Sequence, residues 1–115
     1  MSFSTLVREF GGVTVIDFVG RIALGPSATE VRNVIRETLN SGGRNIVLNL
    51  ALVDYIDSSG LGELVSAYSS VRNAGGDVKL ASLQKRTRDL MQITKLYTVF
   101  SVFPDEKSAR ESFRI

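Results

Sequence analysis

The sequence predicts a single α/β domain over residues 1–115, with a mixed, mostly parallel sheet of five strands and about four helices. Three observations predict this class. The chain has the length of one domain, and 43% of its residues are apolar, enough for one folded core. Short β-branched apolar segments alternate with segments whose apolar residues recur at helical spacing. No repeat, linker or low-complexity tract divides the chain. The expected element order is β-β-α-β-α-β-α-β-α.

The first two strands are predicted in residues 3–22, "FSTLVREFGGVTVIDFVGRI". Gly11 and Gly12 supply the positive φ that a tight hairpin turn requires. Apolar residues alternate after the turn, at Val13, Val15 and then Phe18. We therefore expect an antiparallel hairpin at the start of an otherwise parallel sheet.

The first helix is predicted in residues 25–43, "GPSATEVRNVIRETLNSGG". Ser27 and Glu30 match the S-x-x-E pattern of a capping box, which indicates a helix start. A glycine pair at 42–43 indicates the helix end. The residues that recur at helical spacing between these signals are Val31, Val34, Ile35, Thr38 and Leu39.

The central strand and the second helix are predicted in residues 45–77. Residues 45–52, "NIVLNLAL", are almost continuously apolar, which is typical of a strand buried on both faces. The helix follows "VDYID" and ends before "NAGGD". One face of it is marked by Leu61, Leu64, Val65, Tyr68 and Val71.

The remaining elements are shorter. A fourth strand is predicted at 78–81, "VKLA", and a fifth at 98–104, "TVFSVFP". Between them, residues 85–96 predict a third helix with Leu90, Ile93 and Leu96 facing inward. Asp105 is a candidate cap for a last short helix that extends through Phe113.

The composition excludes several classes of function. The chain contains no Cys and no His, so it has no disulfide, no thiolate or imidazole metal site and no Ser-His relay. Its net charge of +2 is too small to indicate nucleic-acid binding, and its densest basic patch, Lys85, Arg86 and Arg88, fits the solvated first turn of a helix. No apolar run reaches membrane-spanning length, and the first residues lack a secretory signal pattern, so we expect a cytoplasmic protein.

The segment "IDSSGLG", residues 56–62, is the candidate functional site. It follows the predicted central strand, and α/β folds usually place ligand sites at the carboxyl end of such strands. It is not a nucleophile elbow, because Ile56 and Asp57 precede the serines. It is not a dinucleotide fingerprint either, since Val65 stands where a small residue belongs, and the lysine of a P-loop is absent. Two compatible accounts remain, a helix cap and a phosphate acceptor.

The helix cap and the phosphate acceptor use different residues of this segment. Asp57 or Ser58 can accept hydrogen bonds from the first free amides of the helix. A serine there is also exposed beside the positive end of the helix dipole, which tolerates a phosphoryl group. Gly62 needs a further reason, because glycine inside a helix costs about 1 kcal/mol relative to alanine. Either the helix packs closely on the sheet at this point, or another chain approaches its exposed side.

Residues 44–64, "RNIVLNLALVDYIDSSGLGEL", resemble the hallmark segment of the bacterial anti-sigma factor antagonists in the STAS domain family (sulfate transporter and anti-sigma factor antagonist). The resemblance extends over essentially the full chain. It implies a binding module rather than an enzyme, without a cofactor or bound metal. Such an antagonist binds an anti-sigma factor that is a serine kinase and so releases a sigma factor. The kinase switches it off by phosphorylating a serine, and a serine phosphatase reverses the modification.

Carried over by position, the resemblance implies that Ser58 is the phosphorylation site. It also implies that Asp57, Ser59, Gly60, Leu61 and Gly62 contact the partner. In the loop after the second strand, which also contacts the kinase in the family, Arg21 and Ala23 stand where acidic residues are common. The alternative function is a STAS scaffold subunit of a larger signalling or lipid-transport assembly, without phospho-switching. Weak homodimerisation is left open.

Overall fold

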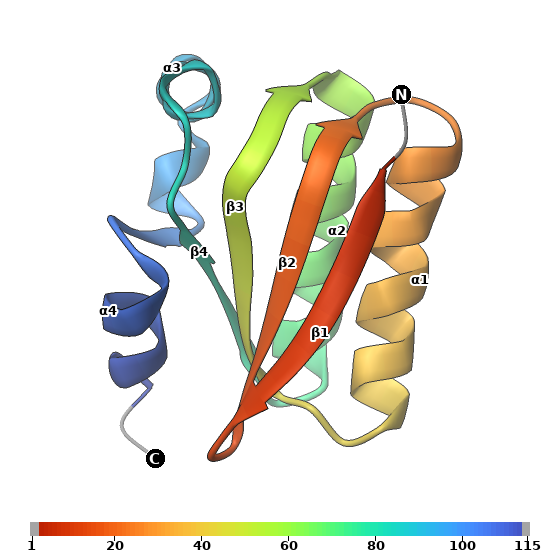
Figure 1. Ribbon diagram of the computed structural model, residues 1–115, viewed down its shortest axis with the longest axis vertical. Helices are drawn as coiled ribbons and strands as arrows, with labels where there is room; N and C mark the ends of the chain where they lie inside the picture. The colour runs from red at the N-terminus through yellow and green to blue at the C-terminus, as the bar shows by residue number, and fades with distance from the viewer. Residues whose placement is uncertain (1–2, 114–115) are drawn as a thin grey trace.

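The computed structural model describes residues 3–113 and confirms the predicted element order and sheet (Figure 1). In this part of the chain the sheet has five strands in the order β1-β2-β3-β4-β5. The first pair is antiparallel and the other pairs are parallel. The strands are β1 (Ser4–Phe10), β2 (Val13–Ile22), β3 (Asn45–Ile56), β4 (Asp77–Ala81) and β5 (Ser101–Phe103). The helices are α1 (Pro26–Asn40), α2 (Ser58–Asn73), α3 (Lys85–Thr94) and α4 (Glu106–Glu111), with a 3-10 turn over Leu96–Thr98.

The predicted hairpin joins β1 to β2. Gly11 and Gly12 have φ values of 51° and 93°, and Phe10 pairs with Val13 directly beside the turn. Two successive residues with positive φ match the twist of the flanking strands, which is why this turn contains two glycines.

Two apolar layers cover the two faces of the sheet. Helices α1 and α2 lie on one face, where Phe18, Leu48 and Leu80 of the strands are buried with Val31 and Leu64 of the helices (Figure 1). Helix α4 lies on the other face over a smaller cluster, Val13, Val15, Val47, Ala81 and Ala109. Strand β3 contributes to both layers, which explains its nearly continuous apolar sequence.

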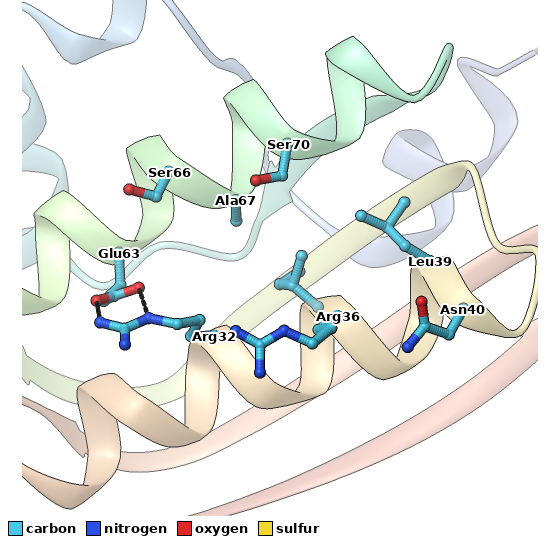
Figure 2. Close-up of a pocket in the computed structure, with 9 residues that line it drawn as sticks. Arg32, Arg36, Leu39, Asn40, Glu63, Ser66, Ala67 and Ser70 are labelled. Carbon is cyan, nitrogen blue, oxygen red and sulfur yellow. Dashed lines mark hydrogen bonds and ion pairs between the residues drawn. The ribbon is translucent and has the colours of Figure 1, made fainter.

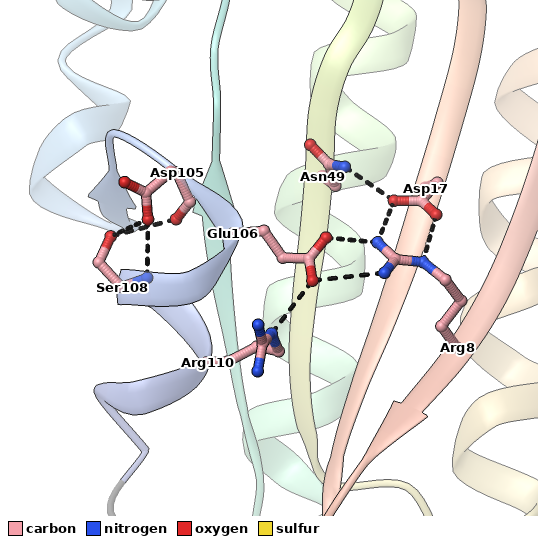
Figure 3. A network of polar contacts seen from close by, with 7 residues as sticks. All are labelled: Arg8, Asp17, Asn49, Asp105, Glu106, Ser108 and Arg110. Carbon is pink, nitrogen blue, oxygen red and sulfur yellow. Dashed lines mark hydrogen bonds and ion pairs between the residues drawn. The ribbon is translucent and has the colours of Figure 1, made fainter.

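A polar network fastens α4 to the first strands (Figure 3). The Arg8 guanidinium donates to both carboxylate oxygens of Asp17, at 2.6 and 2.8 Å, and also to the Glu106 carboxylate. Asn49 donates to Asp17 at 2.7 Å, and Arg110 donates to Glu106 at 3.1 Å. The hydrogen bond from Arg8 holds the pKa of Asp17 below its ordinary value, so this carboxylate stays ionised inside the network.

The start of α1 differs from the prediction. The helix begins at Pro26, after Gly25 with φ 109°, and no side chain caps it. Ser27 is already inside the first turn, where its Oγ accepts from the Ala23 N–H at 2.9 Å and donates to the Ala23 carbonyl at 3.1 Å. The predicted capping box of Ser27 and Glu30 is therefore wrong. The fixed φ of proline suits the first helical position, and the N-cap is Gly25, two residues before the predicted Ser27.

The inward face of α3 also differs. Thr87 and Met91, four residues apart, are the buried residues of this helix, whereas Ile93 is 78% exposed and Leu90 is only partly buried. Leu96 lies beyond the helix, because Lys95 adopts left-handed backbone geometry with φ 60° and ends it. The predicted inward face is therefore wrong for Ile93, whereas Leu90 and Leu96 are partly buried and pack against the main core.

Three other boundaries shift without changing the topology. Strand β3 continues beyond the predicted residues 45–52 to Ile56 and reaches the candidate site directly. Strand β5 has only three residues, and α4 ends at Glu111 rather than Phe113. Asp105 caps α4 as predicted, accepting from the Ser108 N–H at 2.8 Å. In the described residues 3–113, no helix has the length and apolarity needed to cross a bilayer.

Candidate functional site

Asp57 connects three segments at the carboxyl end of the sheet. It is the N-cap of α2, and its Oδ1 accepts from the Gly60 N–H at 2.8 Å. Its Oδ2 accepts from the Leu24 N–H at 3.0 Å, and its own N–H donates to the Ile22 carbonyl at 3.2 Å. The predicted cap is confirmed for Asp57. The same carboxylate also holds the loop of residues 23–25 against the start of α2.

The Asp57 carboxylate has a structural role and is a poor general base. Hydrogen bonds from the backbone hold the pKa of Asp57 below its ordinary value. The bond from the Gly60 N–H has the largest effect, and the bond from the Leu24 N–H has the next largest. At neutral pH the group is therefore ionised, and both of its oxygens already accept backbone hydrogen bonds. It has little tendency to take a proton from a neighbouring serine, and the described chain offers no histidine for that purpose. The geometry supports recognition at this site more than nucleophilic catalysis.

The two serines differ in exposure. Ser58, the first residue of α2, is exposed, and Ser59 is half-buried. Both belong to the first turn of a helix of 16 residues, where the dipole and the free amides favour a negative group. Of the two serines, Ser58 is therefore the more exposed.

Glycine occupies the two positions of the motif, 60 and 62, for different physical reasons. A Cβ built on Gly60 would lie 2.2 Å from the Ile22 carbonyl oxygen, so this glycine lets α2 pack directly on the end of β2. A Cβ on Gly62 would meet no atom within 4 Å, and the residue is exposed. Of the two reasons that the sequence left open for Gly62, close packing on the sheet is excluded. Its bare backbone faces solvent beside the serines.

Residues that the sequence argument missed complete this surface. Leu24 is 80% exposed, although its backbone is tied to Asp57. It borders an open hollow of about 510 Å³ between the loop of residues 23–25, α1 and α2. Arg32 of α1 and Glu63 of α2 form an ion pair across the same hollow, 2.5 Å between Nη2 and Oε2. The residues that line the hollow are Leu24, Gly25, Ala28, Thr29, Arg32, Ser59, Gly62, Glu63 and Ser66.

Six of the predicted site residues, Asp57 and Ser58 among them, do not line this hollow. Leu61 is only 6% exposed and belongs to the main apolar core, and Gly60 is buried where α2 contacts Ile22 at the end of β2. Ala23 is half-buried in the turn that precedes α1. Arg21 is exposed, but its guanidinium stacks on the ring of Tyr55, 4.2 Å from the centroid, and lines no part of the hollow. The surface that remains consists of Ser58, Ser59, Gly62 and Leu24, which we call the docking surface.

Comparisons with known proteins agree on one family. A family model described as the STAS domain matches residues 4–109. A curated relative, a putative anti-sigma factor antagonist of Thermotoga neapolitana, is 35% identical over 78 residues, which are 68% of this chain and 69% of that protein.

Two solved structures share the fold. The crystal structure of a putative anti-sigma factor antagonist from Thermotoga maritima is similar with a TM-score of 0.89 at 23% identity, covering 96% of this chain and 95% of that one. The structure of the Bacillus cell fate determinant SpoIIAA in its phosphorylated form has a TM-score of 0.74 at 18% identity, covering 96% and 100% of the two chains. At these identities the structural likeness establishes the fold alone.

Proposed function

Because the chain belongs to the STAS domain family, we propose that it is an anti-sigma factor antagonist whose partner binding is switched by phosphorylation of Ser58. In this proposal the unmodified protein binds an anti-sigma factor that is a serine kinase, and a sigma factor is released. The kinase transfers phosphate to Ser58, the complex dissociates, and a serine phosphatase restores the binding form. The observation that carries the proposal is an exposed serine directly after a capping aspartate, beside a glycine whose outer side is empty.

The docking surface suits a partner that comes close to the backbone. Gly62 presents no side chain, and the space above it is open. Leu24, 80% exposed at the border of the same hollow, provides an apolar anchor. The hydrogen bond from its N–H to Asp57 fixes the loop before the partner arrives, which lowers the ordering cost of binding.

Phosphorylation would reverse the electrostatics of this surface. A phosphoryl group adds a charge of about −1.5 to −2 at neutral pH. It would stand directly beside Asp57, which is already ionised, while the helix dipole and the free amides of α2 keep the fold stable. A partner surface matched to a neutral hydroxyl and an ionised Asp57 would then face concentrated negative charge. We expect an affinity loss of about a hundredfold, since like-charge contacts in an interface cost several kcal/mol.

The first test is phosphorylation by the cognate kinase-type anti-sigma factor and ATP, followed by mass spectrometry. We expect one phosphate on the wild type and on Ser59→Ala, and none on Ser58→Ala. Ser59→Ala is the matched control, because Ser59 follows Ser58 directly in the chain and is less exposed than Ser58. A phosphate on Ser58→Ala, or an unmodified wild type under conditions where the kinase phosphorylates itself or another substrate, would contradict the assignment.

The second test is binding. Ser58→Asp should weaken kinase binding and Ser58→Ala should preserve it, measured by calorimetry. Gly62→Arg should block the partner with no loss of folding, because the position is open. Asn73→Arg is its control at the other end of α2, about 16 Å further along the helix. Equal affinity for all these variants would reject the docking surface. Co-purification of unphosphorylated wild type with a membrane transport assembly would instead support the scaffold alternative.

A further inference from the structure

A cleft between α1 and α2 extends away from the docking surface. It has a volume of about 340 Å³, within the range of small-molecule sites. Its floor is apolar, with Ile35 and Ala67 buried and Leu39 partly buried. Polar and charged side chains of the two helices rise around this floor (Figure 2). An apolar floor with a few polar groups converging on it is the usual composition of a ligand site.

The charges of the cleft are unbalanced. Glu63 is neutralised by Arg32, whose Nε and Nη2 both donate to its carboxylate. In Figure 2 the Arg36 guanidinium lies one turn further along α1 and is joined to none of the side chains drawn. No ion pair of Arg36 occurs within residues 3–113. The lining therefore carries one uncompensated positive charge.

The neutral polar groups of the cleft are also free within the described chain. Asn40, Ser66 and Ser70 line it, and their side chains make no hydrogen bond to residues 3–113. Other helical hydroxyls of this protein do bond to the backbone. Thr38 of the same helix α1 donates to the Val34 carbonyl at 2.8 Å. The hydroxyls and the amide around Arg36 thus keep their full capacity for a ligand.

We propose that this cleft binds a small monoanionic carboxylate that carries an apolar group. A guanidinium recognises a carboxylate with two parallel hydrogen bonds, and the hydroxyls of Ser66 and Ser70 can supply more. The apolar group would cover Ile35, Leu39 and Ala67. A dianion is disfavoured, because the Glu63 carboxylate lines the same cleft and only one positive charge is free. This proposal does not depend on the anti-sigma factor function.

The position of the cleft gives such a ligand a route to influence partner binding. Arg32 and Glu63 line both the cleft and the hollow at the docking surface. A carboxylate bound to Arg36 would therefore lie beside the ion pair that borders Ser59 and Gly62.

The test is a titration of the isotope-labelled protein with benzoate and hexanoate, followed by heteronuclear NMR, with benzamide and hexanamide as neutral counterparts. We expect saturable shifts of the backbone amides of residues 35–40 and 66–70 with at least one carboxylate. Arg36→Gln should weaken that binding about tenfold, as expected for the loss of a charge-assisted hydrogen-bonding pair. Arg88→Gln, which removes an exposed arginine of α3, is the control and should bind as the wild type does.

Three results would overturn the proposal. They are no saturable shift with either carboxylate, equal binding of the neutral amides, or unchanged affinity in Arg36→Gln. Thermal unfolding of Arg36→Gln should match the wild type, because the side chain is exposed. Phosphorylation of Ser58 in the absence of a carboxylate should also be unchanged in this variant. A failure of the cleft proposal is thereby distinguished from a failure of the phospho-switch.

Discussion

Alanine at the two glycines of the motif should change stability in opposite directions. In Gly60→Ala the new Cβ would lie 2.2 Å from the Ile22 carbonyl oxygen, a contact that must open by more than an ångström. The obstacle is backbone, and the same carbonyl accepts the Asp57 N–H at 3.2 Å, so relief requires a shift of α2 or of the end of β2. Overpacking of this kind costs about 3 kcal/mol. The higher helix propensity of alanine offsets about 1 kcal/mol of this loss. We expect a net loss of about 2 kcal/mol.

Gly62→Ala is the matched comparison, two residues away on the same helix. Its Cβ would meet nothing within 4 Å, so only the helix propensity acts, and the variant should gain about 0.5–1 kcal/mol. Urea unfolding followed by circular dichroism measures both free energies of unfolding. The two variants should differ by about 3 kcal/mol. A Gly60→Ala protein as stable as the wild type, or a Gly62→Ala protein less stable than Gly60→Ala, would refute the packing argument.

Three further predictions concern stability. The lowered pKa of Asp57 means that its stabilising contribution is present above the ordinary carboxyl pKa and is lost on acidification. The difference in unfolding free energy between wild type and Asp57→Asn should therefore shrink as the pH falls below about 4, and a constant difference would contradict this. Arg8→Met leaves two carboxylates of the network in Figure 3 without their shared cation, and urea unfolding should show a loss of about 1–2 kcal/mol that high salt reduces. Gly76→Ala would bring a Cβ within 2.1 Å of the Arg44 carbonyl oxygen and should lower the unfolding midpoint as Gly60→Ala does, whereas an unchanged midpoint would disprove the contact.

The order of elements could be predicted because hydrophobic periodicity reports burial directly. The continuous apolar run of β3 matches its burial in both apolar layers, and the helical spacing of Leu61, Leu64 and Val71 in α2 matches the main core. Helix α3 shows where this reasoning stops. It has only ten residues and carries apolar side chains in several directions, so its inward face depends on where it sits beside the sheet. Met91 is buried there and Ile93 is not.

The start of α1 shows competition between two local signals. The sequence contains both a capping-box pattern at Ser27 and a proline at residue 26. The proline prevails because its ring fixes φ at a helical value, while the serine hydroxyl finds an equivalent partner in the Ala23 backbone. The sequence pattern alone does not show whether Pro26 or the capping box at Ser27 determines where the helix begins.

The candidate site was predicted in part. The cap by Asp57 follows from helix physics, since a helix start needs an acceptor for its free amides. The contribution of Leu24 could not be found in this way, because the hydrogen bond that places it joins residues 33 positions apart. The only local signal was an apolar residue between Ala23 and Gly25, outside any strand or helix periodicity.

Most residues of the motif have a structural role, and this limits which side chains can determine partner specificity. Gly60 and Leu61 are inside the domain, and Asp57 has both oxygens engaged by backbone amides. These residues build the start of α2, and any chain with the same packing would need them whatever its partner. The side chains available for specific contacts with a partner are therefore those that lie beside the start of α2, chiefly Leu24 in the loop before α1. Under the function proposed above, exchanging Leu24 for an acidic residue should therefore change which partner binds while leaving Ser58 exposed, whereas exchanges at Gly60 or Leu61 should act through folding.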